Sequence, residues 1–229
     1  MSSICLIVAG AGASNRFGGM VGKTYLSIGT KAVFLWALDC FSNFKEITQK
    51  LLVVSPKDLS MVGRQWGLEL QKRNVQLVAG GQRRFDSVRA ALAEVDDSVD
   101  LVAVHDAARP AVSSAAIAAA FAKAAQSGAA IVAQQVNQTL KRAEPAGCLS
   151  HVANRSTYWL AQTPQVFGRK LLLRAYAAWP TDQDEPTDDA QVVEAFGQKV
   201  YAVPGGPENI KITTAEDLKL VEAILLATK

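Results

Sequence analysis

Cysteine, histidine and long apolar runs are scarce in this 229-residue chain. The three cysteines, Cys5, Cys40 and Cys148, show no CxxC or CxxH spacing, so neither a disulfide framework nor a zinc site is indicated. The N-terminal apolar run covers only residues 4–9, has no basic segment before it and is too short to cross a bilayer. We therefore expect a soluble, untargeted protein in the reducing cytoplasm.

An excess of one charge sign is also absent. The chain has 24 Lys and Arg against 21 Asp and Glu, a net charge of +3. This balance is too even for a nucleic acid or a membrane surface to be the main partner, whereas a small anionic ligand needs only a local cluster of cations. The length suits a single α/β domain, which we expect to span residues 1–229.

Short β-branched apolar runs alternate with longer amphipathic stretches. The strands predicted from the apolar runs are 4–9, 51–55, 75–80, 101–106 and 129–136. The predicted helices are about 32–43, 57–72, 84–95, 113–127 and 214–228. Ser113 and Gly128 are typical start and stop residues for the Ala-rich helix. This alternation predicts a single doubly wound, mostly parallel sheet with helices on both faces.

Three segments depart from this alternation. Residues 137–160 mix Thr, Lys, Arg, Pro and Gly without a clear period, and we interpret them as an arm that leaves the fold. Residues 181–189 are predicted to form an acidic, turn-rich loop, and residues 205–212 to turn into a short strand before the last helix.

A glycine-rich loop follows the first predicted strand, in LIVAGAGASNRFGGMVGKTYL (6–26). It is not a P-loop, because the residue five places before Gly22 is Phe17 rather than glycine. It is not the dinucleotide fingerprint either, because Asn15 stands at the sixth position.

The loop nevertheless has the properties of an anion site. Main-chain N–H groups around Gly10 to Ser14 can cradle a phosphate or a base, and Arg16 and Lys23 can neutralise its charge. The alternative is a structural turn with surface cations. Because both cations flank a Gly/Ala loop directly after a strand, we favour a nucleotide-phosphate site.

A second glycine turn, AGGQRRFDSV (79–88), places Arg83 and Arg84 at a helix start with Ser87 in its first turn. Basic side chains are unfavourable at a helix N-terminus. This placement indicates either an anionic partner or a solvated basic turn.

Polar residues also end the strand at 101–106. His105, Asp106 and Arg109 stand where polar side chains are unfavourable unless they are paired or face a ligand. Asp106 could hold a ribose hydroxyl or a metal, or it could pair with Arg109. His105 is equally consistent with a core histidine, and the chain has only one other histidine.

Three further turns carry Thr163, Thr187 and Lys211, which are ordinary turn residues one by one and suggest a site only together. Familiar hydrolytic and acid–base motifs are absent, including GxSxG, HExxH and a pair of poised carboxylates. Transfer to an already anionic phosphate needs no general base, because positioning, metal ions and cations then supply the catalysis.

Seven motifs follow one another along nearly the whole chain: GAGASNRFG with Lys23, GGQRRFDSV, HDAARP, QTLKR, ANRSTYWLAQTPQVF, PTDD and GPENIKITTAEDL. In this order they resemble the 2-C-methyl-D-erythritol 4-phosphate cytidylyltransferases of the isoprenoid pathway. The resemblance implies a homodimeric, Rossmann-like nucleotidyltransferase fold with a dimerisation arm at about 137–160. It also implies transfer of CMP from CTP to the sugar-alcohol phosphate, with release of pyrophosphate and with Mg²⁺ bound mainly through the CTP phosphates.

The resemblance carries functional roles to individual positions. Those implied in catalysis are Arg16, Lys23, Arg155 and Lys211. Those implied in nucleotide binding are Gly10, Ala11, Gly12, Gly81, Gln82, Ser87 and Asp106. Those implied on the acceptor side are Asp106, Arg109, Thr139, Thr163 and Thr187, some of them acting from a neighbouring subunit. No residue is assigned as a metal ligand, since Mg²⁺ usually retains several coordinated waters and is bound mainly by substrate phosphates.

The sequence differs from the family pattern at Ser14, Gly22 and Gln138. These differences leave open a nucleotide-binding domain that has lost catalysis. A second alternative is ribitol 5-phosphate as acceptor, because similar enzymes that use it share the opening loop and the HDAARP element. Because both cations of the opening loop are present, we favour an active cytidylyltransferase.

Overall fold

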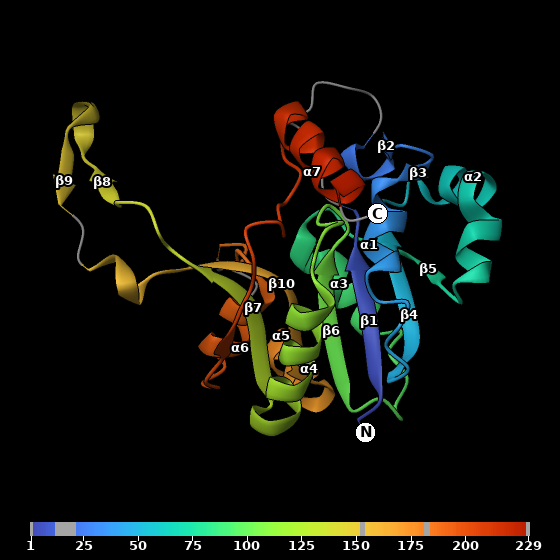
Figure 1. Ribbon diagram of the computed structural model, residues 1–229. Coiled ribbons are helices and arrows are strands. Elements are labelled where there is room, and N and C mark those ends of the chain that lie inside the picture. The colour runs from blue at the N-terminus through green and yellow to red at the C-terminus, as the bar shows by residue number, and fades with distance from the viewer. Residues whose placement is uncertain (1, 12–21, 152–153, 181–183, 228–229) are drawn as a thin grey trace.

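The computed structural model describes residues 2–11, 22–151, 154–180 and 184–227. A seven-stranded sheet has the order β11-β7-β10-β6-β1-β4-β5 (Figure 1). Its strands are β1 (Ile4–Ala9), β4 (Ile47–Val54), β5 (Gln76–Ala79), β6 (Leu101–Asp106), β7 (Ala129–Gln135), β10 (Trp159–Gly168) and β11 (Tyr201–Pro204). Strand β10 is antiparallel to both of its neighbours, β6 and β7, and the other neighbours pair in parallel.

Helices connect these strands. In the described residues the α-helices are α1 (Val33–Asp39), α2 (Leu59–Lys72), α3 (Arg84–Leu92), α4 (Ser114–Ser127), α5 (Arg169–Ala178), α6 (Asp189–Ala195) and α7 (Ala215–Ala227). A small hairpin, β2 (Ser27–Ile28) and β3 (Lys31–Ala32), precedes α1. Within the described ranges, no helix combines the length and apolar character needed to span a lipid bilayer.

Both faces of the sheet are packed with helices. Leu6 and Val8 of β1 belong to one core with residues of α1, α2 and α4, whereas Cys5 and Ile7 belong to a second core with α3, α5 and α6. Successive side chains of a strand point to opposite faces, so a strand covered on both faces reads as a continuous apolar run. The predicted doubly wound, mostly parallel sheet is confirmed.

Most predicted elements have their counterparts at nearly the expected bounds. Strands β1 and β6 begin and end where they were predicted. The Ser113 Oγ accepts a hydrogen bond from the Ala116 N–H (3.3 Å), and Gly128 ends α4 with φ +82°. Both signals for α4 are therefore confirmed. Helix α1 ends at Asp39, earlier than predicted, because turns follow it.

The short strand predicted within 205–212 is wrong. The chain there is irregular, and the strand at this edge of the sheet is β11, which ends at Pro204. The Ile212 N–H donates to the Ala108 carbonyl oxygen (2.9 Å), and the Ile212 side chain is wholly buried in a small core with residues of α7. These contacts, rather than a strand, place Lys211 beside the carboxyl end of β6.

Four elements in the last third of the chain were not predicted: β10, α5, α6 and β11. Strand β10 shows the reason most clearly, because it buries Gln162, Thr163 and Gln165. Buried polar side chains need hydrogen-bond partners, and here these come from segments distant in the sequence.

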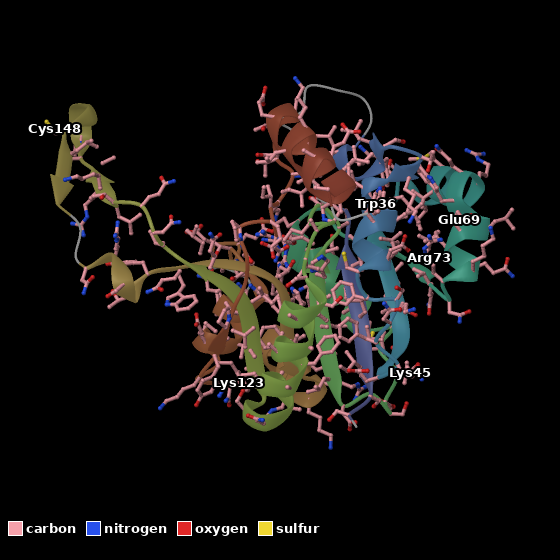
Figure 2. The ribbon with its side chains drawn as sticks, in the orientation of Figure 1. Trp36, Lys45, Glu69, Arg73, Lys123 and Cys148 are labelled. Carbon is pink, nitrogen blue, oxygen red and sulfur yellow. The ribbon has the colours of Figure 1, made fainter. Side chains whose placement is uncertain are left out.

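A hairpin projects from the body of the protein (Figure 1). It consists of β8 (Lys141–Ala143) and β9 (Leu149–His151) and lies within the segment expected to form an arm at about 137–160, whose last two residues, Trp159 and Leu160, belong instead to β10 of the sheet. Exposed Cys148 lies at the hairpin (Figure 2), and all three cysteines are free thiols. Three expectations stay predictions: that the arm forms a dimer contact, that the chain is a single domain, and that the protein is located in the cytoplasm.

An ion-pair network joins α1 and α2 away from this arm. Asp39 pairs with Lys31 (2.6 Å) and with Arg73 (2.8 Å), and Arg73 also pairs with Glu69 (2.6 Å; Figure 2). Burial alone would raise the pKa of Asp39, but Arg73 and Lys31 hold it below its usual value. Asp39 is therefore a structural carboxylate with two cationic partners.

Candidate active site

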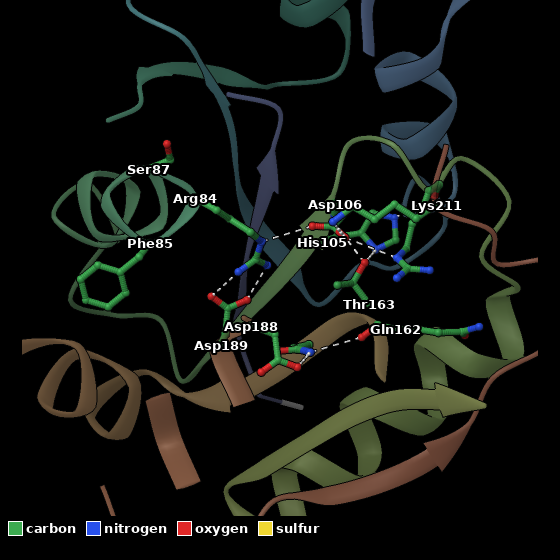
Figure 3. Close-up of polar contacts among 12 residues, drawn as sticks. Arg84, Phe85, Ser87, His105, Asp106, Gln162, Thr163, Asp188, Asp189 and Lys211 are labelled. Atoms are coloured by element: carbon green, nitrogen blue, oxygen red, sulfur yellow. Dashed lines mark hydrogen bonds and ion pairs between the residues drawn. The ribbon is translucent and has the colours of Figure 1, made fainter. Parts of the chain in front are cut away.

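Two cavities meet at the carboxyl ends of β1 and β6. The β1 cavity has a volume of about 240 Å³, and the β10 cavity, which opens beside β10, has a volume of about 200 Å³. Arg84, Asp106 and Lys211 line both cavities and form a shared charged boundary (Figure 3). Ligands of open α/β sheets bind at this edge, outside the carboxyl ends of the strands.

Many of the residues predicted from the sequence line one of these cavities. Those at the β1 cavity are Gly10, Ala11, Lys23, Ser87, Asp106 and Lys211. Those at the β10 cavity are Asp106, Arg109, Thr163, Thr187 and Lys211. The nucleotide-side and acceptor-side predictions thus separate into neighbouring spaces, with Asp106, which was assigned to both, at their boundary.

Close main-chain packing forms one wall of the β1 cavity. The Gly10 N–H donates to the Val53 carbonyl oxygen (2.8 Å), and a Cβ on Gly10 would lie only 3.0 Å from that oxygen. A Cβ on Gly80 would lie 2.7 Å from the Ala11 Cβ. Glycine fits at position 10 because the chain after β1 lies against the main chain of β4, and at position 80 because the loops after β1 and β5 approach each other so closely.

Ser87 stabilises the second glycine turn. Its Oγ accepts a hydrogen bond from the Gly81 N–H (3.1 Å) and donates to the Arg83 carbonyl oxygen (2.9 Å). Ser87 lines the β1 cavity, whereas Gly81 and Gln82 lie in the turn that leads into α3. A nucleotide-binding role for Gly81 and Gln82 stays a prediction.

Two residues of the opening loop, Gly12 and Arg16, lie outside the described residues, so their roles stay predictions. Lys23 begins the short 3₁₀ helix η1 (Lys23–Tyr25) and lines the β1 cavity. One of the two predicted loop cations is thus found beside the predicted nucleotide space.

Asp106 is the centre of the charge cluster at the boundary. Its carboxylate lies 2.9 Å from the Lys211 Nζ, 3.4 Å from the Arg84 Nε and 3.4 Å from the Arg109 Nε. Burial alone would raise the pKa of Asp106, but Lys211, Arg84 and Arg109 hold it well below its usual value. The expected pairing with Arg109 is present, and the same carboxylate also anchors two further cations.

His105 is a core histidine that supports Asp106 from behind. Its Nε2 contacts the Arg109 carbonyl oxygen (3.0 Å), so this nitrogen carries the proton, and its Nδ1 accepts from the Thr163 hydroxyl (3.0 Å). The Thr163 Oγ1 in turn accepts a hydrogen bond from the Asp106 N–H (3.0 Å). Thr163 therefore uses its hydroxyl to hold the end of β6 while it lines the β10 cavity.

His105 predicts a pH-dependent stability. Burial lowers its pKa from 6.5 to about 4, so the unfolded chain takes up this proton at a higher pH than the folded chain does. The stabilising contribution of the neutral ring is complete above about pH 6.5 and is lost as the pH falls towards about 4. Urea unfolding of the wild type and His105→Gln across this range measures it. We expect a shallower pH dependence in the variant, and equal slopes would contradict the prediction.

Two predicted residues lie on the arm rather than at a cavity of this chain. Thr139 and Arg155 are both exposed, and the Arg155 Nη1 donates to the Asn137 carbonyl oxygen (2.8 Å). Arg155 belongs to the 3₁₀ helix η3 (Arg155–Thr157), which lies between β9 and β10 in the chain. A single chain therefore does not bring these two residues together with the Asp106 cluster.

Sequence reasoning did not include Arg84 or Asp189 among the site residues. Arg84 lines both cavities, and its guanidinium pairs with Asp189, the first residue of α6 (2.7 Å). Arg83 pairs with Asp86 (2.8 Å). The basic start of α3 thus has anionic partners within the chain. The sequence did give one indication of a role for Arg84, namely a basic side chain at a helix N-terminus, where it is unfavourable. Asp189 gave none, because it was assigned to an acidic loop.

The described residues suit charge stabilisation better than proton transfer. The Asp106 carboxylate is paired with cations and its pKa is low, which makes it a weak base. His105 is wholly buried and has both ring nitrogens in hydrogen bonds. Three cations at the boundary can instead stabilise negative charge that develops on a phosphate.

The described residues do not form a metal cage. Among them, no group of three or more His, Cys, Asp or Glu side chains is arranged to hold a metal ion. Asp106 is a carboxylate at the boundary, but three cations already surround it. This donor set fits Mg²⁺ only as an ion carried by ligand phosphates, with protein oxygen atoms as minor contributors.

Comparisons with known proteins show the family to which the chain is similar. The family model of IspD, 2-C-methyl-D-erythritol 4-phosphate cytidylyltransferase, matches residues 4–227. The cytidylyltransferase of that name from Endomicrobium trichonymphae is 39% identical over 220 residues, which cover 96% of this chain and 97% of that protein. The one from Bacteroides fragilis is 41% identical over 226 residues, covering 98% of this chain and 100% of that protein.

Solved structures show the same relationship. The 4-diphosphocytidyl-2C-methyl-D-erythritol synthase of Anaerococcus prevotii has a TM-score of 0.85 at 30% identity, covering 98% of this chain and 96% of that chain. The 2-C-methyl-D-erythritol 4-phosphate cytidylyltransferase of Thermus thermophilus has a TM-score of 0.80 at 31% identity, covering 100% of both chains.

Proposed function

Because this chain belongs to the IspD family of 2-C-methyl-D-erythritol 4-phosphate cytidylyltransferases, we propose that its β1 cavity binds CTP and its β10 cavity binds methylerythritol phosphate. The protein is a cytidylyltransferase of isoprenoid biosynthesis. One observation carries the assignment of the cavities: nucleotide-side residues line one space, acceptor-side residues line the other, and Asp106 stands between them.

The reaction then takes place across the boundary. A phosphate oxygen of the acceptor attacks the α-phosphorus of CTP, a new P–O bond forms, and the bond to the β-phosphate bridging oxygen breaks as pyrophosphate leaves. The nucleophile is already anionic, so no residue has to remove a proton. We assign stabilisation of the charge on the phosphates to Lys23 and Lys211, together with Arg16 of the opening loop.

The arm residues support a homodimer as the working unit. Thr139 and Arg155 are exposed, and neither lines a cavity of its own chain. The hairpin projects away from the body of the protein (Figure 1). Large apolar side chains on it and beside it are exposed, among them Leu149 and Trp159. We propose that the arm of one subunit brings Thr139 and Arg155 to the acceptor side of the other.

We propose that Mg²⁺ enters the site with CTP. Bound to the triphosphate, the ion would neutralise part of its charge, which would favour departure of pyrophosphate. The protein contributes the cations and the main-chain donors around the nucleotide, and Asp106 is the carboxylate that lines the cavity assigned to it.

Substrate assays test the proposed function directly. Pyrophosphate release is measured with CTP, ATP, GTP and UTP, each with methylerythritol phosphate and with ribitol 5-phosphate. We expect CTP with methylerythritol phosphate to give the highest kcat/KM, by at least about a hundredfold, because a site that pairs with polar groups of its ligand rejects analogues that lack them.

The other outcomes of this assay have distinct meanings. A preference for ribitol 5-phosphate would overturn the assignment of the acceptor. CTP binding without pyrophosphate release from either acceptor would indicate a nucleotide-binding domain that has lost catalysis, the alternative suggested by Ser14, Gly22 and Gln138.

A further inference from the structure

We infer that Asp189 and Tyr176 are positioning residues that hold the Arg84 guanidinium at the boundary of the two cavities, where Arg84 binds phosphate oxygen atoms of the reacting substrates. The inference rests on the proposed assignment of the cavities. Its starting observation is a wholly buried carboxylate, Asp189, whose cationic partner lines both cavities (Figure 3).

Asp189 contacts Arg84 at two points. The Arg84 Nη1 donates to the Asp189 Oδ1 (3.0 Å), and the Nη2 donates to the Oδ2 (2.7 Å). On its other side the Arg84 Nε donates to the Asp106 Oδ1 (3.4 Å). A two-point contact with a carboxylate fixes the plane of a guanidinium, which a single contact does not. Arg84 is thus held between two carboxylates in one orientation.

Tyr176 holds the carboxylate in turn. Its hydroxyl donates a hydrogen bond to the Asp189 Oδ1, and the residue is buried. Its ring stacks on Phe85, the neighbour of Arg84, with the ring centroids 4.7 Å apart and the planes at 4°. Burial and the adjacent Asp189 carboxylate raise the pKa of Tyr176 well above its usual value, so the hydroxyl keeps its proton and remains a donor.

The start of α6 is also tied to the sheet, which keeps Asp189 in place. The Gln165 side chain of β10 accepts a hydrogen bond from the Ala190 N–H (2.9 Å) and donates to the Asp188 Oδ2 (2.8 Å). Asp188 caps α6 by accepting from the Gln191 N–H (2.9 Å). Tyr176 and Gln165 therefore fix the carboxylate from α5 and from β10.

Stability alone is a weak explanation for this ion pair. Removing two charges from water opposes folding, and buried ion pairs are often no more stabilising than apolar side chains of similar size. Asp189 has no exposed surface, whereas the Arg84 side chain is 22% exposed and lines both cavities. Since a guanidinium has more N–H groups than these three contacts use, Arg84 retains donors for a ligand.

The charge at the boundary suits phosphate. The three cations Arg84, Arg109 and Lys211 are matched by three carboxylates, Asp106, Asp188 and Asp189. Lys23 of the β1 cavity then gives the two cavities one net positive charge. Burial alone would lower the pKa of Arg84, but Asp189 and Asp106 raise it above its usual value, so Arg84 stays charged. A fixed, charged guanidinium between the nucleotide and acceptor spaces is in reach of phosphate groups from either side.

A double-variant cycle tests the inference. Tyr176→Phe removes only the hydroxyl and keeps the stacked ring, and Arg84→Lys keeps the charge but loses the two-point contact. We expect Arg84→Lys to lower kcat at least tenfold, and Tyr176→Phe to lower it about threefold to tenfold with smaller changes in KM. In the Arg84→Lys background, Tyr176→Phe should have no further effect, because Tyr176 acts through the guanidinium.

The chain offers matched controls. Tyr201→Phe removes an exposed hydroxyl on β11, and Arg83→Lys changes the neighbouring arginine, which pairs with Asp86 and lines neither cavity. Both controls should keep kcat within about twofold of the wild type. Wild-type kcat in Tyr176→Phe or in Arg84→Lys would overturn the inference. So would a Tyr176→Phe loss of the same size in both backgrounds, which is the result expected of a merely structural role.

A binding measurement keeps the test independent of turnover and of the folding of Arg84→Lys. Calorimetry with inorganic pyrophosphate should show at least threefold weaker binding to Tyr176→Phe than to Tyr201→Phe, and equal binding would overturn the inference. If the wild type released no pyrophosphate from CTP and methylerythritol phosphate, the proposed function would fail, and the pyrophosphate titration would still decide the role of Tyr176.

Discussion

Asp106→Asn is expected to lower kcat/KM for both CTP and methylerythritol phosphate at least about a hundredfold, or about 2.7 kcal/mol in the barrier. The substitution preserves the shape of the side chain but removes the charge that Lys211, Arg84 and Arg109 share. These cations then repel one another without an anchor, so their directions toward the substrates change. Initial rates with each substrate varied in turn measure the loss.

Asp39→Asn is the matched control for this prediction. Asp39 also has two cationic partners, Lys31 and Arg73, but it lies in the network between α1 and α2 and lines neither cavity. It should keep kcat/KM within about threefold of the wild type. Thermal unfolding of both variants separates loss of activity from loss of fold. A folded Asp106→Asn enzyme with near wild-type kcat/KM would show that this carboxylate does not organise the site.

Lys23→Ala is expected to lower kcat/KM at least tenfold, which corresponds to about 1.4 kcal/mol in the barrier. Lys23 lines the β1 cavity beside the main chain of Gly10 and Ala11, where we assign the triphosphate. Its ammonium would offset negative charge that grows on the phosphates as pyrophosphate leaves. Because this charge is larger in the transition state than in bound CTP, kcat should fall more than KM rises. A coupled assay of pyrophosphate release gives both constants.

Lys72→Ala provides the comparison for Lys23→Ala. Lys72 is an exposed lysine of α2 whose ion pair is with Glu69 (3.0 Å), so its loss should leave both kinetic constants unchanged. A Lys23→Ala enzyme with the same kcat as Lys72→Ala would remove Lys23 from the mechanism.

The predictable part of the fold is the part in which each strand is buried by its own apolar residues. Strands β1 and β6 read directly from the sequence because both of their faces are covered, which requires an unbroken apolar run. Strand β10 could not be predicted in this way, because it buries the polar side chains of Gln162, Thr163 and Gln165. Their hydrogen bonds reach His105, Ala190 and Asn209, and no local pattern reveals partners so far away in the chain.

The site divides in a similar way. Asp106 and Arg109 are three residues apart, and their pairing could be expected from the sequence. Arg84 and Asp189 are separated by 105 positions, and the acidic stretch that contains Asp189 reads locally as a solvent-exposed turn. Only the packing of α6 against α5 and β10 buries that carboxylate and brings it within ion-pair distance of Arg84.

The order of apolar and amphipathic segments predicted a layered, mostly parallel sheet with helices on both faces, because side-chain periodicity is a local property of a chain. The motif order likewise identified the family and its chemistry. Tertiary structure alone decided which charges neutralise each other, that residues 205–212 form an anchored loop instead of a strand, and that two cavities share one boundary. The physical reason is that desolvation and Coulomb interaction depend on distance through space, which the positions of residues along a chain do not specify.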